Sequence, residues 1–216
     1  MPYNVTILFA ATLIVKLYDR VPPHRIARYA FAVVAAGLFW LALVIRNDWS
    51  TLQVMVGLIM VGLGQGALVT LLFNVLVSAS PKELASDVGA LRGTTNSLAA
   101  AVGTAVAGAL AVGLLSAVVT ANLSNNPVIT ANLKAEIDLN SIDFISNDRL
   151  ATGLEQRQAT PEQVAEAVRI NTQARLQALK MSFLVLAGLA LLAIVPSGTL
   201  PGYLPGEVSN GTTSSA

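Results

Sequence analysis

The feature that most constrains the fold is the stretch 57–117, in which two long apolar segments are joined by a short charged turn at 80–87. A helix crosses a bilayer with about 20 mostly apolar residues, so each segment is long enough to span one. The composition agrees, because only 12% of the residues are charged, whereas a soluble domain carries about 25%. The sequence therefore predicts an all-α integral membrane protein.

Apolar runs predict five transmembrane helices, at about residues 1–17, 27–45, 52–78, 89–120 and 180–196. The third and fourth are longer than the hydrocarbon core requires, so we expect them to tilt or protrude. The first is short, and it is not a secretory signal because its cations follow the apolar run instead of preceding it. We expect the chain to begin abruptly inside an apolar segment.

Cations in the short loops predict the orientation of these helices. The first loop holds four cations and the third holds two, whereas the second holds only Arg46. By the positive-inside rule, the first and third loops face the cytoplasm of a multi-pass protein of the cell (inner or plasma) membrane. The region 121–179 then lies outside, since long loops cross regardless of charge. The Gly/Ser/Thr-rich tail 197–216 is predicted to be cytoplasmic and disordered.

One helix start is visible inside the predicted external region. Thr160 can cap a helix, Pro161 suits its first turn, and Gln163 can complete a capping box. We expect a helix from about residue 161 that runs straight into the fifth span.

Polar side chains separate the five spans into two groups. Gln65 and Asn74 lie on the third span, and Thr94, Thr95 and Asn96 lie on the fourth. An amide without a partner in hydrocarbon costs roughly 4–8 kcal/mol, so it must face a neighbouring helix or a wet cavity. The two threonines are expected to bond back to their own helix. The second and fifth spans are almost entirely apolar, and the sequence predicts that they can face lipid on all sides.

Small residues also gather on the third and fourth spans, where they allow two helix backbones to approach closely. The predicted packing positions are Gly62, Gly64, Gly66, Gly89, Gly93 and Gly103. On the fourth span small residues recur every four positions. A straight helix rotates by about 40° over each such step, so no single neighbour can use the whole stripe.

Composition excludes several classes of function. The chain has no cysteine and one histidine, His24, so neither a thiolate nor a multi-histidine metal site is available. Its net charge of +1 gives no basic excess for nucleic acid. A membrane enzyme is disfavoured, because no cluster of catalytic carboxylates or histidines lies at membrane depth. We expect no cofactor.

Five segments carry a likeness to a known family: Gly62-Leu63-Gly64-Gln65-Gly66, Asn74, Ser80-Pro81-Lys82-Glu83-Leu84-Ala85, Gly89-Ala90-Leu91 and Gly103-Thr104-Ala105-Val106-Ala107-Gly108. They resemble the drug:proton antiporter-2 branch of the major facilitator superfamily, whose members have fourteen helices. The likeness covers roughly residues 1–120 and 176–196 and matches helices ten to fourteen. It implies that the five spans form most of a C-terminal six-helix bundle, with the first, third and fourth lining a central path.

The resemblance also implies partners and roles. The N-terminal helices of the same transporter, with their proton-carrying carboxylates, would complete the path beside a lipid bilayer and a small-molecule substrate. Asp19 and Arg20, with basic character at Arg25, resemble a degenerate cytoplasmic gating motif, although Pro22 and Pro23 depart from its pattern. The alternative for this loop is an ordinary solvated positive-inside loop. Another cation, Arg92, is expected to snorkel to lipid headgroups.

These features favour efflux of small organic solutes or drugs by alternating access, with proton coupling in the full-length protein. Gln65, Asn74, Thr95 and Asn96 are the predicted substrate-path residues, and Asn74 is the foremost of them. The alternative for the amides is hydrogen bonding between helices, worth about 0.6 kcal/mol on average. The alternative for the whole chain is a non-transporting five-helix protein, or an inactive truncated fragment, that acts only as an assembly partner.

Overall fold

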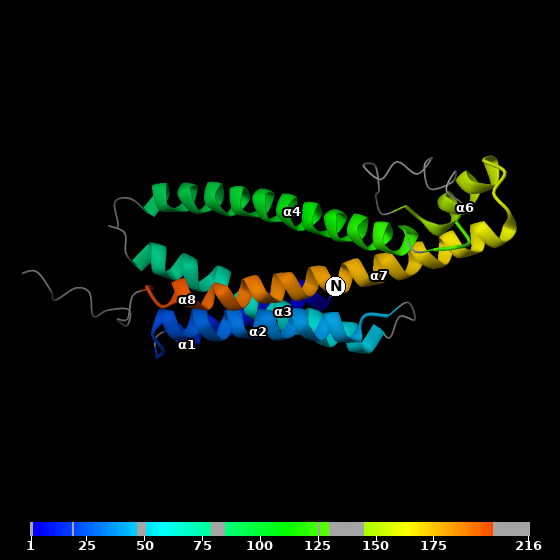
Figure 1. Cartoon of the computed structure of the whole chain (residues 1–216). Helices are drawn as coiled ribbons and strands as arrows, with labels where there is room; N and C mark the ends of the chain where they lie inside the picture. The colour runs from blue at the N-terminus through cyan, green and yellow to red at the C-terminus, as the bar shows by residue number, and fades with distance from the viewer. Residues whose placement is uncertain are drawn as a thin grey trace, which may run out of the picture. The chain divides into compact units, whose positions relative to one another are not determined.

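The structure is a computed structural model that describes residues 2–18, 20–46, 51–78, 85–124, 126–129 and 145–200. Every regular element in these ranges is a helix (Figure 1). The elements are α1 (Pro2–Tyr18), α2 (Pro23–Val44), α3 (Thr51–Ser78), α4 (Ala85–Ser124), α6 (Asn147–Gln156), α7 (Pro161–Leu192) and α8 (Ile194–Ser197).

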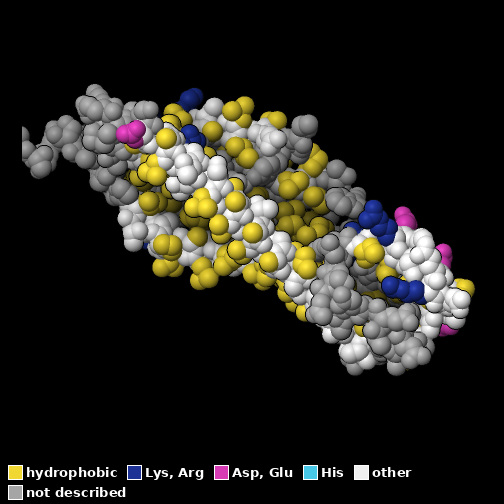
Figure 2. All heavy atoms as spheres, turned by 90° about the horizontal axis from the view of Figure 1, so that it is seen from above, with side chains coloured by type: hydrophobic (Ala, Val, Ile, Leu, Met, Phe, Trp, Pro, Cys, Tyr) yellow, Lys and Arg dark blue, Asp and Glu magenta, His cyan; other side chains and the backbone are white. Residues whose placement is uncertain are grey.

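Four of these helices are long and apolar enough to cross a membrane, judged by length and composition: α2, α3, α4, and α7 together with α8. Helix α1 is apolar but shorter. On the face drawn in Figure 2, hydrophobic side chains predominate along the helices. The described chain is therefore an all-helical protein of membrane-spanning character.

Two helices are longer than a bilayer is thick. Helix α4 has 40 residues and α7 has 32, which at about 1.5 Å per residue gives lengths of roughly 60 and 48 Å. The hydrocarbon core is only about 30 Å thick. Part of each helix therefore extends beyond it. The charged residues of α7 all lie between Glu162 and Lys180, so that part of the helix is the part suited to water.

The contacts divide the chain into two compact units. The first unit contains α1, α2, α3, the start of α4 to Val102, the end of α7 from Leu184, and α8. The second unit contains α4 from Gly103, α6, and α7 up to Phe183.

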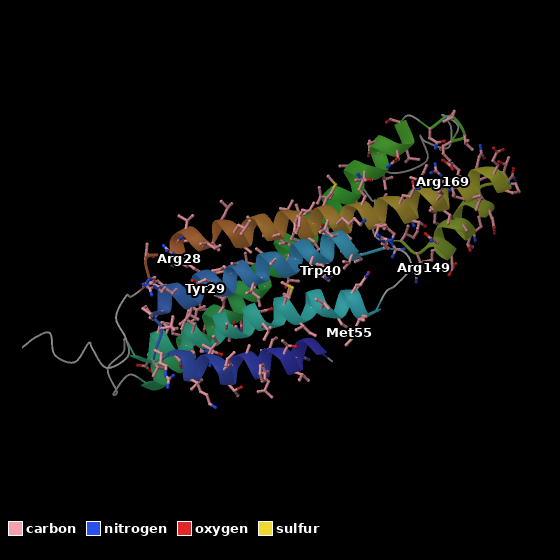
Figure 3. All side chains as sticks on the ribbon, turned by 90° about the horizontal axis from the view of Figure 1, so that it is seen from below. Arg28, Tyr29, Trp40, Met55, Arg149 and Arg169 are labelled. Atoms are coloured by element: carbon pink, nitrogen blue, oxygen red, sulfur yellow. The ribbon has the colours of Figure 1, made fainter. Side chains whose placement is uncertain are left out.

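In the first unit, α3 packs against both α1 and α2 (Figure 3). The core of this packing consists of Ile14, Ile26, Ala27, Ala30, Ala67 and Leu71. The prediction that the second span can face lipid on all sides is wrong, because eight residues of α2 are buried. Most of these are small, so α2 packs closely without any polar residue that would reveal its buried face in the sequence.

Glycines set the closeness of this packing. A Cβ at Gly64 would lie 2.5 Å from Val34 Cγ2 and 2.7 Å from the backbone oxygen of Ala30, both on α2. A Cβ at Gly66 would lie 2.7 Å from the backbone oxygen of Ile7 on α1. Real Cβ atoms do not approach backbone this closely, so α3 holds α1 and α2 at distances that only glycine permits.

A hydrogen bond from a tryptophan indole joins the C-terminal part of α2 to the N-terminal part of α3. Trp40 Nε1 donates to the backbone oxygen of Gln53 at 2.9 Å, and Figure 3 shows Trp40 well along α2 from Arg28 and Tyr29. Tryptophan suits the membrane interface because its ring is apolar and its N–H needs a partner. The bond fixes the register of the two helices next to the loop that joins them.

The second unit is built around the C-terminal end of α4 and the first half of α7. Leu115 and Val118 of α4 pack against Ala174 and Ala178 of α7. A neighbouring cluster adds α6 through Leu154. Helix α6 has an N-cap, in which Ser146 accepts from the backbone N–H of Arg149. Helix α6 was not predicted from the sequence, because it is only ten residues long and mostly polar.

The predicted capping box at the start of α7 is present. The backbone N–H of Gln163 donates to Thr160 Oγ1 at 3.3 Å, and the backbone N–H of Thr160 donates to Gln163 Oε1 at 3.0 Å. Helix α7 then runs without a break from Pro161 to Leu192. It covers both the predicted external helix and most of the predicted fifth span. Of the predicted disordered tail, residues 201–216 lie outside the described part of the chain.

Replacing Thr160 by alanine is expected to destabilise the second unit by about 1 kcal/mol, the typical cost of losing an N-cap hydroxyl. The backbone N–H of Gln163 loses its acceptor, so its amide hydrogen should exchange with solvent faster. Amide hydrogen exchange over the first turn of α7 measures this. Thr160→Ser keeps the hydroxyl and serves as the control. Equal exchange in both variants would show that the cap contributes nothing.

Candidate functional site

The two predicted path residues of α3 lie on opposite sides of that helix. Gln65 and Asn74 are nine residues apart on one unbroken helix, and at about 100° per residue this separation is about 180°. Gln65 is exposed, whereas Asn74 is half-buried. A single path running along α3 can therefore contact one of these amides directly, but not both.

The side of α3 that carries Gln65 is fixed by its two neighbouring glycines. Gly64 contacts α2 and Gly66 contacts α1. Leu63 and Ala67 face the space between α1 and α2, and Gln65 points about 180° from the midpoint between them. Asn74 points toward the same side as Leu63 and Ala67, two turns further along α3. Gln65 therefore faces away from the packing of α1 and α2, and Asn74 faces toward it.

Helix α4 is largely uncovered by the part of the chain that the structure describes. Only 11% of its apolar window is buried, compared with 39% for α2. Thr95 and Asn96 are both exposed. The predicted back-bond is present at Thr94, whose Oγ1 donates to the backbone oxygen of Ala90 at 2.9 Å. The surroundings of α4 must therefore supply hydrogen-bond partners for the side-chain amide of Asn96.

The predicted packing glycines behave differently on the two helices. Gly64 and Gly66 on α3 meet neighbouring backbone, as described above, and Gly62 is buried. On α4, no heavy atom lies within 4 Å of the position that a Cβ would take at Gly89, Gly93 and Gly103. Close approach of another helix to α4 thus stays a prediction at these three positions.

The predicted gate loop is described only in part. Asp19 lies outside the described residues. Arg20 and Arg25 are both exposed, and the structure brings neither into an ion pair with a described carboxylate. Its third arginine, Arg28, approaches the end of α8, where its Nη2 atom lies 2.5 Å from the position of a Cβ at Gly198. The gating role of Arg20 and Arg25 therefore stays a prediction.

Arg92 has a protein partner. Its guanidinium carbon lies 4.3 Å from the centre of the Phe73 ring, so the cation of α4 rests on an aromatic side chain of α3. Such cation–π contacts contribute about 0.5–1 kcal/mol at exposed sites and more when desolvated. The contact gives Arg92 a favourable protein partner two turns inside α4. Its predicted contact with lipid headgroups stays a prediction.

The second unit holds a polar network that the sequence analysis missed. Asn171 is buried, and its Nδ2 atom donates to the backbone oxygen of Ile145 at 3.2 Å and to Asn147 Oδ1 at 2.8 Å. Asn147 Nδ2 in turn donates to Thr172 Oγ1 at 3.0 Å. These bonds tie the start of α6 to the middle of α7, and they satisfy the buried amide. Nothing in the sequence distinguished Asn147 and Asn171 from the other amides of this region.

An ion pair lies one turn earlier on α7. Arg169 Nη2 donates to Glu166 Oε1 at 2.6 Å, and Asn126 Nδ2 donates to the same oxygen at 2.6 Å. These hydrogen bonds, that of Arg169 first, lower the pKa of Glu166 to about 2. Glu166 is therefore ionised at neutral pH and accepts bonds from two elements. The carboxylate thereby ties Asn126 to α7.

The described side chains do not form a metal site, since no group of three or more potential ligands from His, Asp and Glu gathers among them. A groove of about 330 Å³ is present in the first unit, between α1, α2 and α3, and its lining is formed by apolar side chains. No protein-family model, curated protein or solved structure matches the chain.

Proposed function

We propose that the chain is part of a membrane transporter that exports small organic solutes by alternating access. Its five apolar helices would form most of the C-terminal six-helix bundle of a major-facilitator fold. In such a transporter two helix bundles rock about a binding site near the middle of the membrane. The proposal joins the resemblance described above to the polar and glycine-rich character of α3 and α4.

The observation that carries the proposal is the uncovered state of α4. A helix of this length, with Thr95 and Asn96 exposed, cannot present a bare hydroxyl and a bare amide to hydrocarbon without a cost of several kcal/mol. Either water or another protein segment must meet them. In the proposed bundle, α4 would border the central path, and the N-terminal helices of the transporter would face it.

Proton coupling would require groups outside this chain's spans. The predicted spans contain no aspartate or glutamate, and a proton-coupled pump needs an ionisable group within the membrane. The carboxylates would therefore belong to the N-terminal helices. The role left for this chain is to shape the path and bind the solute through amides, hydroxyls and apolar surface.

Replacing Asn74 by leucine is expected to lower export by the complete gene product, because leucine removes both hydrogen-bonding groups of the amide. A lost hydrogen bond to substrate, worth about 0.5–1.5 kcal/mol, corresponds to a reduction of roughly two- to tenfold in transport at limiting substrate. Export of dye substrates from cells, normalised to the amount of protein in the membrane, measures it.

Gln65→Leu is the matched control, because Gln65 is the same kind of residue on the opposite side of α3. Loss of export in Asn74→Leu with retention in Gln65→Leu places the path on the Asn74 side. Unchanged export and an unchanged substrate range in Asn74→Leu would remove Asn74 from the path.

The non-transporting alternative is distinguished by the gene itself. A reading frame that continues upstream of Met1 and encodes nine further apolar helices supports the exporter. A genuine translation start at Met1 supports a five-helix protein that acts as an assembly partner.

A further inference from the structure

The groove of the first unit combines an apolar channel with a basic end. Its volume of about 330 Å³ is at the lower end of the range of roughly 300–1,000 Å³ found for ligand sites. The groove exists because small residues from three helices form part of its lining. These residues are Ala10 on α1, Ala30 on α2, and Gly64 and Ala67 on α3.

Larger side chains stand at the sides of the groove and leave it open. Leu13 on α1 is 51% exposed and Tyr29 on α2 is 72% exposed, although both line the groove. Beneath them Ala10, Ala30 and Ala67 are buried and form the floor of the groove. In a bilayer, an apolar groove with exposed apolar sides is accessible to an acyl chain.

Cations gather where the groove ends, at the turn between α1 and α2. Val21 and Ile26 line this end, and each directly follows an arginine in the sequence, Arg20 and Arg25. Lys16, two residues after the lining residue Ile14, is exposed, as are both arginines. Between residues 16 and 28 the sequence holds four cations and a single acid, Asp19.

These cations are not used by the rest of the described structure. The ion pair found among the described residues joins Arg169 and Glu166, far along the sequence on α7. Arg28 approaches Gly198 at the end of α8. Lys16, Arg20 and Arg25 therefore remain as three exposed positive charges beside the end of an apolar groove. By the positive-inside rule they lie at the cytoplasmic surface, where anionic lipids attract basic residues.

We propose that this groove binds one anionic phospholipid molecule, with an acyl chain along α1, α2 and α3 and the phosphate on Arg20 and Arg25. An apolar ligand would leave the cations without a counter-charge, and a free phosphate ion would leave the groove empty. A phospholipid supplies both a negative charge for the cations and an apolar chain for the groove. Its headgroup lies at one end of the chain, as the cations lie at one end of the groove. The inference does not depend on the transport proposal.

The test is lipid binding to the full chain, purified in a neutral detergent and measured by native mass spectrometry. Phosphatidylglycerol and phosphatidylcholine with identical acyl chains are titrated in parallel. The phosphatidylglycerol complex is expected to form at lower lipid concentration. Arg25→Gln should weaken it about fivefold, which corresponds to the roughly 1 kcal/mol that one basic residue contributes near an anionic surface.

Arg46→Gln is the matched control, because Arg46 is an exposed arginine that follows the opposite end of α2. It should leave binding unchanged. Equal binding of the two lipids, or equal weakening in Arg25→Gln and Arg46→Gln, would overturn the proposal.

A second variant tests the acyl-chain part of the site. Val33→Trp fills the groove from α2 and leaves every cation in place. It is expected to weaken phosphatidylglycerol binding at least as strongly as Arg25→Gln, and unchanged binding in a folded variant would place the chain elsewhere. Inorganic phosphate provides a readout that needs no variant. It should not raise the unfolding temperature of the wild-type chain, whereas phosphatidylglycerol should, and equal stabilisation by both would overturn the acyl-chain contact.

Discussion

Replacing Gly64 by alanine is expected to destabilise the first unit by about 2–3 kcal/mol, the upper part of the range for overpacking a filled interior. The added methyl group would meet Val34 Cγ2 at 2.5 Å, the backbone oxygen of Ala30 at 2.7 Å and the backbone nitrogen of Val34 at 3.1 Å. A side chain can rotate away, but two of these three atoms belong to the backbone of α2. The two helices must therefore separate along their contact.

The same substitution on α4 is the matched control. Gly93→Ala adds a methyl group where no heavy atom lies within 4 Å. Alanine is also the better helix former, by about 0.5–1 kcal/mol, so this variant should be as stable as the wild type or slightly more stable. The unfolding free energy of each variant in detergent measures the difference, expected to be about 3 kcal/mol. Equal destabilisation by both would mean that α4 is as tightly covered as α3.

The comparison of Gly64 with Gly93 also shows how far the sequence could predict this fold. Both glycines belong to the same kind of small-residue pattern, and the sequence assigned both to packing. Apolar length predicted the positions of α2, α3 and α4, because a membrane span needs a long run of apolar residues. The pattern could not tell which glycines meet a neighbour, since that depends on which helices are adjacent.

Other differences between the predictions and the structure have similar causes. Helix α2 contains Ala, Val, Leu, Phe and Gly with few polar residues, so polarity gave no sign of its eight buried positions. The start of α7 was predictable, because a capping box is a local pattern of side chains and backbone. The network around Asn171 was not, because its partners on the chain lie 24 and 26 residues away.

The candidate site was predictable as a set of residue types and not as an arrangement. The sequence identified Gln65 and Asn74 as amides within a predicted span, and their opposite directions follow from their spacing on one straight helix. The groove between α1, α2 and α3 was not visible in the sequence. It results from small residues on three separate helices, and no local spacing brings these together.

Cysteines introduced at Asn74 and Asn96 are expected to react with a charged methanethiosulfonate reagent at least tenfold faster than a cysteine at Leu189. The given sequence has no cysteine, so each substitution adds one thiol to it, and the unsubstituted complete gene product gives the background labelling to subtract. The reactive form is the thiolate, and each unit by which an apolar environment raises the thiol pKa lowers the thiolate fraction about tenfold. Reactivity therefore reports water beside the side chain, and mass spectrometry of the labelled protein measures it.

Two reference positions give the scale of this measurement. Leu189 is an exposed apolar residue of α7, on the span predicted to lie at the periphery, and it represents the lipid-facing extreme. Arg157 is exposed just after α6, and a cysteine there represents the aqueous extreme. The experiment is made on the complete gene product in intact membranes, with equal insertion of each variant. Slow labelling at 74 and 96, equal to that at 189, would show that these amides serve helix contacts and border no water-filled path.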